Sequence, residues 1–187
     1  MPESNLTKKA IALSAKELTK EKPYDKISIS DIADRCGIKR QTFYYHVQDK
    51  YELLVWIYFN ELFVPNMEDI SLENWDEKLG AILTQMQEEK KFYINTIKHA
   101  EDYIIQYMLE VAEQTFEEAI DKLDEKSHLK NEERGIFARF FAYGICGIIV
   151  EWAKGGMKMA PEKLADYMRE MLEKCKQAVY ISDHDRQ

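Results

Sequence analysis

The segment from Ile38 to Lys50 concentrates side chains that can donate hydrogen bonds to a nucleic acid. At its start, Arg40 can fork onto guanine and Gln41 can pair with adenine, so both are suited to reading base edges. Hydroxyl, phenol and ammonium groups around them can reach phosphate oxygens, contacts that fix the register without reading sequence. The residues predicted to contact DNA are Ser28, Lys39, Arg40, Gln41, Thr42, Tyr44, Tyr45, His46 and Lys50.

Each of these residues also has a simpler interpretation. Tyr and His side chains in a short helix often do no more than pack, and a Lys-Arg pair at a helix start is usually a solvated face. With DNA contact assumed, Lys39 to Gln41 form the base-reading end. Ser28, Thr42, Tyr44, His46 and Lys50 then face phosphates, and Tyr45 faces a thymine methyl group or a sugar.

Other site chemistry is not indicated by the sequence. His99, His128 and His184 have no partner at ligand spacing, so we expect no metal. Neither a Ser-His-Asp or Cys-His arrangement nor a glycine-rich phosphate loop is visible, so we expect no catalytic residue and no cofactor. Cys36, Cys146 and Cys175 are odd in number and far apart, which argues against a disulfide framework.

The expected location is the cytoplasm. Unpaired cysteines fit a reducing compartment, and the N-terminus has no apolar stretch typical of a signal peptide. The most apolar run, Ile136 to Trp152, contains Arg139 and Glu151 and is short for a bilayer span, so we expect no membrane partner.

Charge is divided unequally along the chain. Residues 1–50 hold ten Lys or Arg and seven Asp or Glu, a net charge of +3, so residues 51–187 carry −11 of the total of −8. A basic end suits a polyanion that an acidic body would avoid, although chance can also divide charge in this way.

The elements that must position Ile38–Lys50 are helices. Helix-forming residues dominate, alternating strand patterns are lacking, and the expected fold is all-α. Residues 5–21 are expected to form an amphipathic helix, with a stripe at three- and four-residue spacing made of Leu6, Ala10, Leu13 and Glu17 or Leu18. Ser28 or Ser30 is expected to cap a second helix. Gly37 supplies a left-handed turn, and Ile38, Phe43 and Val47 pack the following helix inward. Asp49 and Glu52 form a capping box for the next helix, which Pro65 is expected to end.

These observations predict two parts, residues 1–65 as a helix-turn-helix head and residues 66–187 as a helical body. A loop is expected over residues 66–76. Body helices are predicted at about 76–89, 91–99, 102–126, 130–155 and 160–180.

Residues 6–65 resemble the DNA-binding head of the TetR/AcrR family of bacterial transcription regulators. The resemblance is carried by Ile27-Ser28-Ile29-Ser30-Asp31-Ile32-Ala33, Cys36-Gly37-Ile38, Thr42-Phe43-Tyr44-Tyr45-His46-Val47 and Lys50-Tyr51-Glu52-Leu53. Val47 replaces a usual Phe, and Gln41 stands where a small residue is common. The run Arg40-Gln41-Thr42-Phe43-Tyr44, with Gly147 to Trp152 and Gly156 ahead of Pro161, is similar to a subgroup that includes the activator of dihydroxyacetone kinase operons. In the family, positions matching Tyr44, His46 and Lys50 contact phosphates.

The last two helices are candidates for pairing with a second copy. Phe137 to Trp152 is apolar nearly all round, which predicts burial, and Ala142, Gly144 and Gly147 would let another helix approach closely. The final helix has an apolar seam running from Leu164 through Tyr167, Met168, Met171, Leu172 and Cys175 to Val179. A four-helix dimer interface, as the family uses, is expected; the alternative is a core helix of a monomer.

The body is also the expected place of a small-molecule effector. Polar or aromatic residues on its apolar segments would need partners that a ligand could supply, although they can equally be satisfied core or interface residues. The candidates are Tyr93, His99, Tyr103, Tyr107, Arg139, Tyr143 and Cys146. A protein coregulator docking on the body is an alternative trigger.

The sequence therefore predicts a homodimeric, sequence-specific transcription regulator that binds a pseudo-palindromic double-stranded DNA operator and is not an enzyme. The alternative is a helical interaction or ligand-carrier module without DNA binding.

Overall fold

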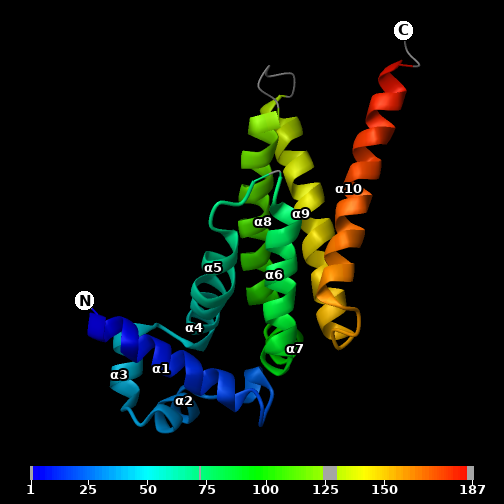
Figure 1. Cartoon of the computed structure of the whole chain (residues 1–187). Helices are drawn as coiled ribbons and strands as arrows, with labels where there is room; N and C mark the ends of the chain where they lie inside the picture. Colours follow the sequence, from blue (N-terminus) through cyan, green and yellow to red (C-terminus); the bar gives the residue numbers. More distant parts are fainter. Residues whose placement is uncertain (1, 72, 124–129, 185–187) are drawn as a thin grey trace.

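The computed structural model describes residues 2–71, 73–123 and 130–184, and within them every regular element is a helix, as predicted. The helices are α1 (Pro2–Leu18), the 3-10 helix η1 (Tyr24–Lys26), α2 (Ile29–Cys36), α3 (Arg40–His46), α4 (Lys50–Ile57), the π-helix η2 (Tyr58–Phe63), α5 (Val64–Met67), α6 (Trp75–Glu88), α7 (Lys90–His99), α8 (Glu101–Leu123), α9 (Asn131–Lys154) and α10 (Pro161–His184). Helices α1 to α3 lie at one end of the molecule, and α6, α8, α9 and α10 run away from them (Figure 1).

The buried face of α1 differs from the predicted one. Leu6 and Leu13 are 67% and 59% exposed, whereas Ile11 and Ala15 are fully buried; of the predicted stripe, Leu18 is buried. Both sets have helical spacing, so periodicity alone cannot choose between them. The face that is buried carries the small Ala15, which lets α1 pack closely against the rest of the head.

Helices α2 and α3 form as the sequence predicts. Ser28 caps α2 in a reciprocal box with Asp31, and Gly37 ends it with a φ of 70°, in the left-handed region. Phe43 and Val47 are buried at 0% and 2% exposure, with Ile38 packed partly buried against the same core. These anchors fix which side of α3 faces outward.

The helix after Asp49 does not end at Pro65, so that prediction is wrong. Asp49 caps α4 as predicted, although Glu52 accepts from the Gln48 backbone N–H and so does not close the predicted box with Asp49. The chain then continues through the π-helix η2 into α5, which contains Pro65. Pro65 directly follows the π-helix, where the Val64 N–H bonds to the Phe59 carbonyl and the regular α-helical hydrogen-bond pattern is already interrupted, so the proline does not end the helical run. The division between residues 65 and 66 stays a prediction.

The body helices begin and end within a few residues of their predicted positions, but α9 is not buried all round. Phe140 and Tyr143 are 73% and 61% exposed, while Ala142 and Cys146 on the opposite side are buried. On α10, Leu164 and Met168 are buried and Tyr167 and Met171 are about half exposed; the predicted seam residues Cys175 and Val179 have side chains outside the described set. By length and composition alone α9 could cross a membrane, a weak indication because core helices also pass, and 39% of its apolar window is buried.

Candidate nucleic-acid interface and body cavity

Helix α3 presents a basic and aromatic face to solvent. Lys39, Arg40 and Gln41 are exposed at its start, and Tyr44 and Tyr45 follow at 48% and 82% exposure. Because Phe43 holds the opposite side in the core, this face has a fixed orientation. It is the size and composition of a major-groove reader.

Arg40 and Tyr44 are joined across one turn of that face. The Arg40 guanidinium donates from Nη2 to the Tyr44 hydroxyl at 3.1 Å and lies 5.9 Å from the centre of the Tyr44 ring. Thr42 and His46 are half-buried beside them, and the His46 ring contacts the Tyr45 ring edge-on at 5.3 Å. The phenol thus gives the guanidinium a preferred direction before any ligand is present.

Ser28 is exposed, but its hydroxyl is already engaged. Its Oγ donates to Asp31 Oδ2 at 2.7 Å and accepts from the Asp31 backbone N–H at 3.1 Å. Lys22 lies 2.8 Å from the same carboxylate. Hydrogen bonds from Lys22 and then Ser28 hold the pKa of Asp31 well below its usual range.

Lys50 turns inward from the α3 face. Its Nζ donates to the carbonyl oxygens of Tyr24, Asp25 and Ile27 at 3.0, 2.9 and 2.8 Å. The nine predicted DNA-contact residues therefore divide into a group on and around α3, Ser28 at the start of α2, and Lys50 on the inner side of the head.

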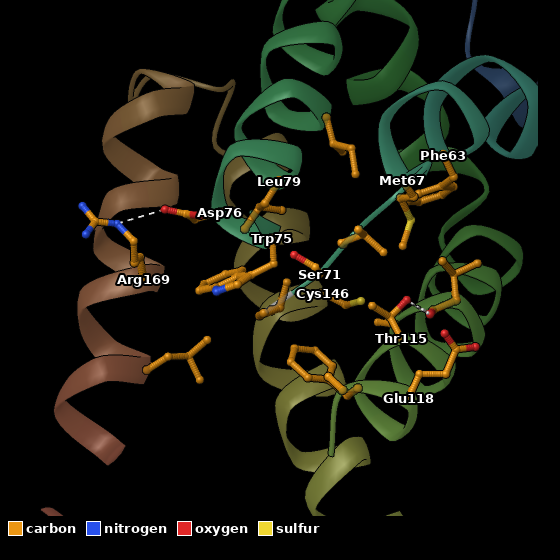
Figure 2. A pocket seen from close by; sticks show the side chains of 18 of the residues that line it. Phe63, Met67, Ser71, Trp75, Asp76, Leu79, Thr115, Glu118, Cys146 and Arg169 are labelled. Carbon is orange, nitrogen blue, oxygen red and sulfur yellow. Dashed lines mark hydrogen bonds and ion pairs between the residues drawn. The ribbon is translucent and has the colours of Figure 1, made fainter. Parts of the chain in front are cut away.

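A cavity of about 340 Å³ lies in the body, between α6, α8, α9 and α10 and beside α5. Its lining is mainly apolar; Figure 2 shows Trp75, Leu79 and Cys146 around it, with Phe63 and Met67 at the α5 side. Its polar and charged side chains are those of Ser71, Glu73, Asp76, Thr115, Glu118, Lys122, Arg169 and Glu173. Thr115 Oγ donates to the Val111 carbonyl at 2.8 Å, and at the α10 side Arg169 Nε lies 3.1 Å from Asp76.

Of the seven predicted effector residues, the structure brings Cys146 to this cavity. Tyr93 is fully buried among Tyr58 and Phe92, and Tyr107 packs on Phe63 with ring centres 5.7 Å apart. The hydroxyl groups of Tyr93 and Tyr107 are buried without a hydrogen-bond partner, and burial raises the pKa of Tyr107 to about 12.

The other four predicted residues lie on the surface. His99 Nδ1 is 3.6 Å from Asp25 Oδ1, and Tyr103 stacks on Tyr51. Arg139 Nε donates to the Gly135 carbonyl at 3.1 Å, and Tyr143 is exposed on α9. Met108, Val111 and Thr115 of α8 also line the cavity, and the signal in the sequence that could have indicated this wall is a threonine among apolar residues at helical spacing.

The head and the body are tied together near α7. Asn95 donates from Nδ2 to the carbonyl oxygens of Thr19 and Lys22 at 2.7 and 2.9 Å, and its Oδ1 accepts from the Tyr24 N–H at 2.8 Å. Lys16 of α1 lies 2.8 Å from Glu61 of η2 and also pairs with Glu89. Movement of α7 is therefore coupled to the turn that precedes α2.

In the described residues, no three His, Cys, Asp or Glu side chains come together as ligands for a metal ion.

Two family matches cover most of the chain. Residues 11–56 match a family described as bacterial regulatory proteins, tetR family, and residues 73–174 match one described as a transcriptional regulator C-terminal region. The first interval contains α2 and α3 with the exposed basic face, and the second contains the cavity-forming helices α6, α8 and α9.

Individual proteins show the same similarity. The chain is 29% identical over 157 residues to the HTH-type dhaKLM operon transcriptional activator DhaS of Lactococcus lactis subsp. lactis (strain IL1403), covering 81% of each protein. A solved structure of a dihydroxyacetone kinase operon activator DhaS superposes with a TM-score of 0.68 at 30% identity, over 90% of this chain and 94% of that one.

More distant structures share the fold. NalD, the secondary repressor of the MexAB-OprM multidrug efflux pump in Pseudomonas aeruginosa, matches with a TM-score of 0.59 at 20% identity, over 91% of this chain and 96% of that one. The fatty acid degradation regulator FadR from Bacillus halodurans matches with a TM-score of 0.63 at 16% identity, over 89% and 94%.

Proposed function

The chain belongs to the TetR family and is a DNA-binding transcriptional regulator, and we propose that it acts as a homodimer on a pseudo-palindromic operator under the control of a body-bound effector. The observation that carries the proposal is the α3 face, on which basic and aromatic side chains are exposed over the buried anchor Phe43. In bacteria such a regulator works in the cytoplasm, where the DNA is.

In the proposed complex α3 enters the major groove. Lys39, Arg40 and Gln41 lie at the end of the helix that meets base edges, and a guanidinium prepositioned by Tyr44 is suited to guanine. Thr42, Tyr44, Tyr45 and His46 flank the groove and serve phosphates or sugars.

The proposed dimer uses α9 and α10. Ile136, Phe140 and Tyr143 form an exposed apolar stripe on α9 at 62%, 73% and 61% exposure, and α10 exposes Tyr167 and Met171. A Cβ added at Gly144 or Gly147 would meet no atom of the same chain within 4 Å, so these positions leave room for a helix of a second copy. Pairing would set the two α3 helices about 34 Å apart, which is one helical turn of DNA, or a whole multiple of that distance, so that both can enter major grooves on one side of the duplex.

The proposed effector site is the apolar cavity, and its chemistry favours a largely apolar ligand. Because the lining is mainly apolar, a ligand with a large apolar part gains more free energy by entering it than a small polyol does. An effector shifts the head only if it binds one arrangement of the two heads better than the other. A protein coregulator docked on the body would likewise have to bind one arrangement of the two heads better than the other.

The test is binding of the purified protein to DNA from its own upstream region, measured between about 50 and 200 mM salt. A steep loss of affinity with salt, together with a dimer in sedimentation, is the expected result. Salt-independent binding, or no binding to any upstream fragment, would favour a helical interaction or ligand-carrier module.

A further inference from the structure

Lys50 lies in a cage that the head builds around its ammonium group. Three carbonyl oxygens, from Tyr24, Asp25 and Ile27, accept its hydrogen bonds at 2.8 to 3.0 Å. The rings of Tyr24 and Tyr51 flank it, with their centres 5.5 and 5.1 Å from Nζ. The Tyr24 hydroxyl donates back to the Lys50 carbonyl oxygen.

This cage uses the whole hydrogen-bonding capacity of the side chain. An ammonium group has three N–H donors and no acceptor, and each of the three has a carbonyl partner here. A phosphate contact would require at least one of these bonds to break. Partial burial also lowers the pKa of Lys50 from its usual value, as expected for an ammonium held away from water.

The segment held by the cage leads directly into α2. The carbonyls of Tyr24 and Asp25 belong to η1, and Ile27 is the extended residue immediately before the cap Ser28. No side chain caps η1 at its N-terminal end, and Lys50 holds it through two ammonium hydrogen bonds and the bond from the Tyr24 hydroxyl to the Lys50 carbonyl. This attachment therefore bears on where α2 begins. Because α3 packs against α2, it also bears on the position of α3.

The same cage is joined to the body on two sides. The backbone N–H of Tyr24 donates to Asn95 of α7, and the ring of Tyr51 stacks on Tyr103 of α8. Lys50 thus stands where the α7 and α8 contacts meet the turn before α2.

We propose that Lys50 is a positioning residue, which sets the start of α2 by binding the carbonyls of residues 24, 25 and 27, and is not a phosphate contact. This inference rests on the proposed DNA binding. It separates Lys50 from the exposed residues Lys39 and Arg40, whose ammonium and guanidinium groups face outward.

Salt dependence distinguishes the two roles. When a protein neutralises one phosphate fewer, the slope of log affinity against log salt becomes shallower by about 0.9. Lys50→Met is expected to weaken operator binding about 10- to 100-fold at a temperature well below its melting point, since it removes hydrogen bonds from a charged group, with the slope unchanged. Lys39→Met is the matched control: it removes an exposed positive charge from the DNA-facing end of α3, so the slope is expected to become shallower.

Lys50→Arg adds a second discrimination. A planar guanidinium keeps the charge but cannot match three carbonyls arranged around a point ammonium, so binding is expected to be as weak as in Lys50→Met. A phosphate contact would tolerate Arg. Full affinity in Lys50→Arg, or a flattened slope in Lys50→Met, would overturn the inference.

Tyr24→Phe is a second test that does not depend on the Lys50 variants remaining folded. It removes the hydroxyl that bonds the Lys50 carbonyl and leaves the ring in place, so affinity is expected to fall about fivefold with the slope unchanged. Wild-type affinity in Tyr24→Phe would contradict the positioning role. If the wild-type protein itself shows no salt-dependent binding, the proposed function fails, a result distinct from any pattern among these variants.

Discussion

The rings of Tyr51 and Tyr103 stack nearly parallel, with their centres 4.0 Å apart and their planes 9° apart. Tyr51 lies in the first turn of α4, next to the cage around Lys50, and Tyr103 begins α8. Further along α8, Met108 and Thr115 line the body cavity. One rigid helix therefore connects the cavity wall to the DNA-binding part of the chain.

Tyr103→Ala is expected to lower the free energy of unfolding by about 0.5–1 kcal/mol, the lower part of the range for an aromatic pair because Tyr103 is half exposed. Urea unfolding measures this change. Tyr103→Phe keeps the ring and is the control, with an expected change near zero. Equal losses in the two variants would mean that the phenol oxygen, and not the stack, stabilises the junction.

Asn95→Ala is expected to cost about 2–3 kcal/mol of unfolding free energy, because two carbonyls and one N–H lose their partner at a partly buried junction. Gln106→Ala, which removes one exposed hydrogen bond to Glu110, is the control and should stay within about 0.5 kcal/mol. Chemical denaturation of both variants decides the matter. A similar small loss in both would show that Asn95 does not hold the head.

The parts predicted correctly from the sequence are those that local chemistry determines. The Ser28 cap, the Gly37 turn and the buried Phe43 all depend on residues within a few positions of one another. The face of α1 was predicted wrongly because two apolar stripes share the same period, and only packing against other helices distinguishes them. The prediction at Pro65 failed because the π-helix before it, which the sequence did not indicate, lets the helical run continue past a proline.

The cavity was hardly predictable, because its walls come from helices far apart in the chain. Of the proposed ligand residues, Cys146 alone reaches the lining, while Tyr93 lies in the core and Tyr143 on the surface. The direction of Lys50 was hidden for a related reason. A long flexible side chain at a helix start can point to solvent or to a turn 23 to 26 residues away, and its neighbours in sequence do not decide which.

Gln41→Ala is expected to change which bases are preferred at one position of each half-site, because an amide paired with adenine discriminates by about 1–3 kcal/mol. Tyr44→Ala should weaken binding to all sequences and, because Tyr44 orients Arg40, should also relax the preference for guanine at the base that Arg40 reads. Selection from a randomised operator library measures both effects. An unchanged preferred site with Gln41→Ala would remove Gln41 from the base-reading group.

Cys146 is expected to resist alkylation in the folded protein. Burial raises the pKa of its thiol to about 12, so at pH 8 the reactive thiolate is scarce. In a variant with Cys36→Ser and Cys175→Ser, iodoacetamide should react at least about a hundredfold more slowly than after unfolding in denaturant, and faster as the pH rises toward 12. Mass spectrometry follows the modification. Equal rates in the folded and unfolded protein would contradict the burial of this thiol.

Phe140→Glu is expected to dissociate the proposed dimer, because it places a carboxylate at the middle of the exposed apolar stripe on α9. Burying that charge without a partner costs several kcal/mol, so the dissociation constant should rise at least about a hundredfold. Leu13→Glu, at a 59% exposed leucine of α1, is the control and should leave the dimer intact. Sedimentation velocity over a concentration series measures both variants. The Phe140→Glu protein should also lose affinity for a complete operator while keeping that for an isolated half-site, since each α3 face is unchanged; an intact dimer in this variant would place the subunit interface elsewhere.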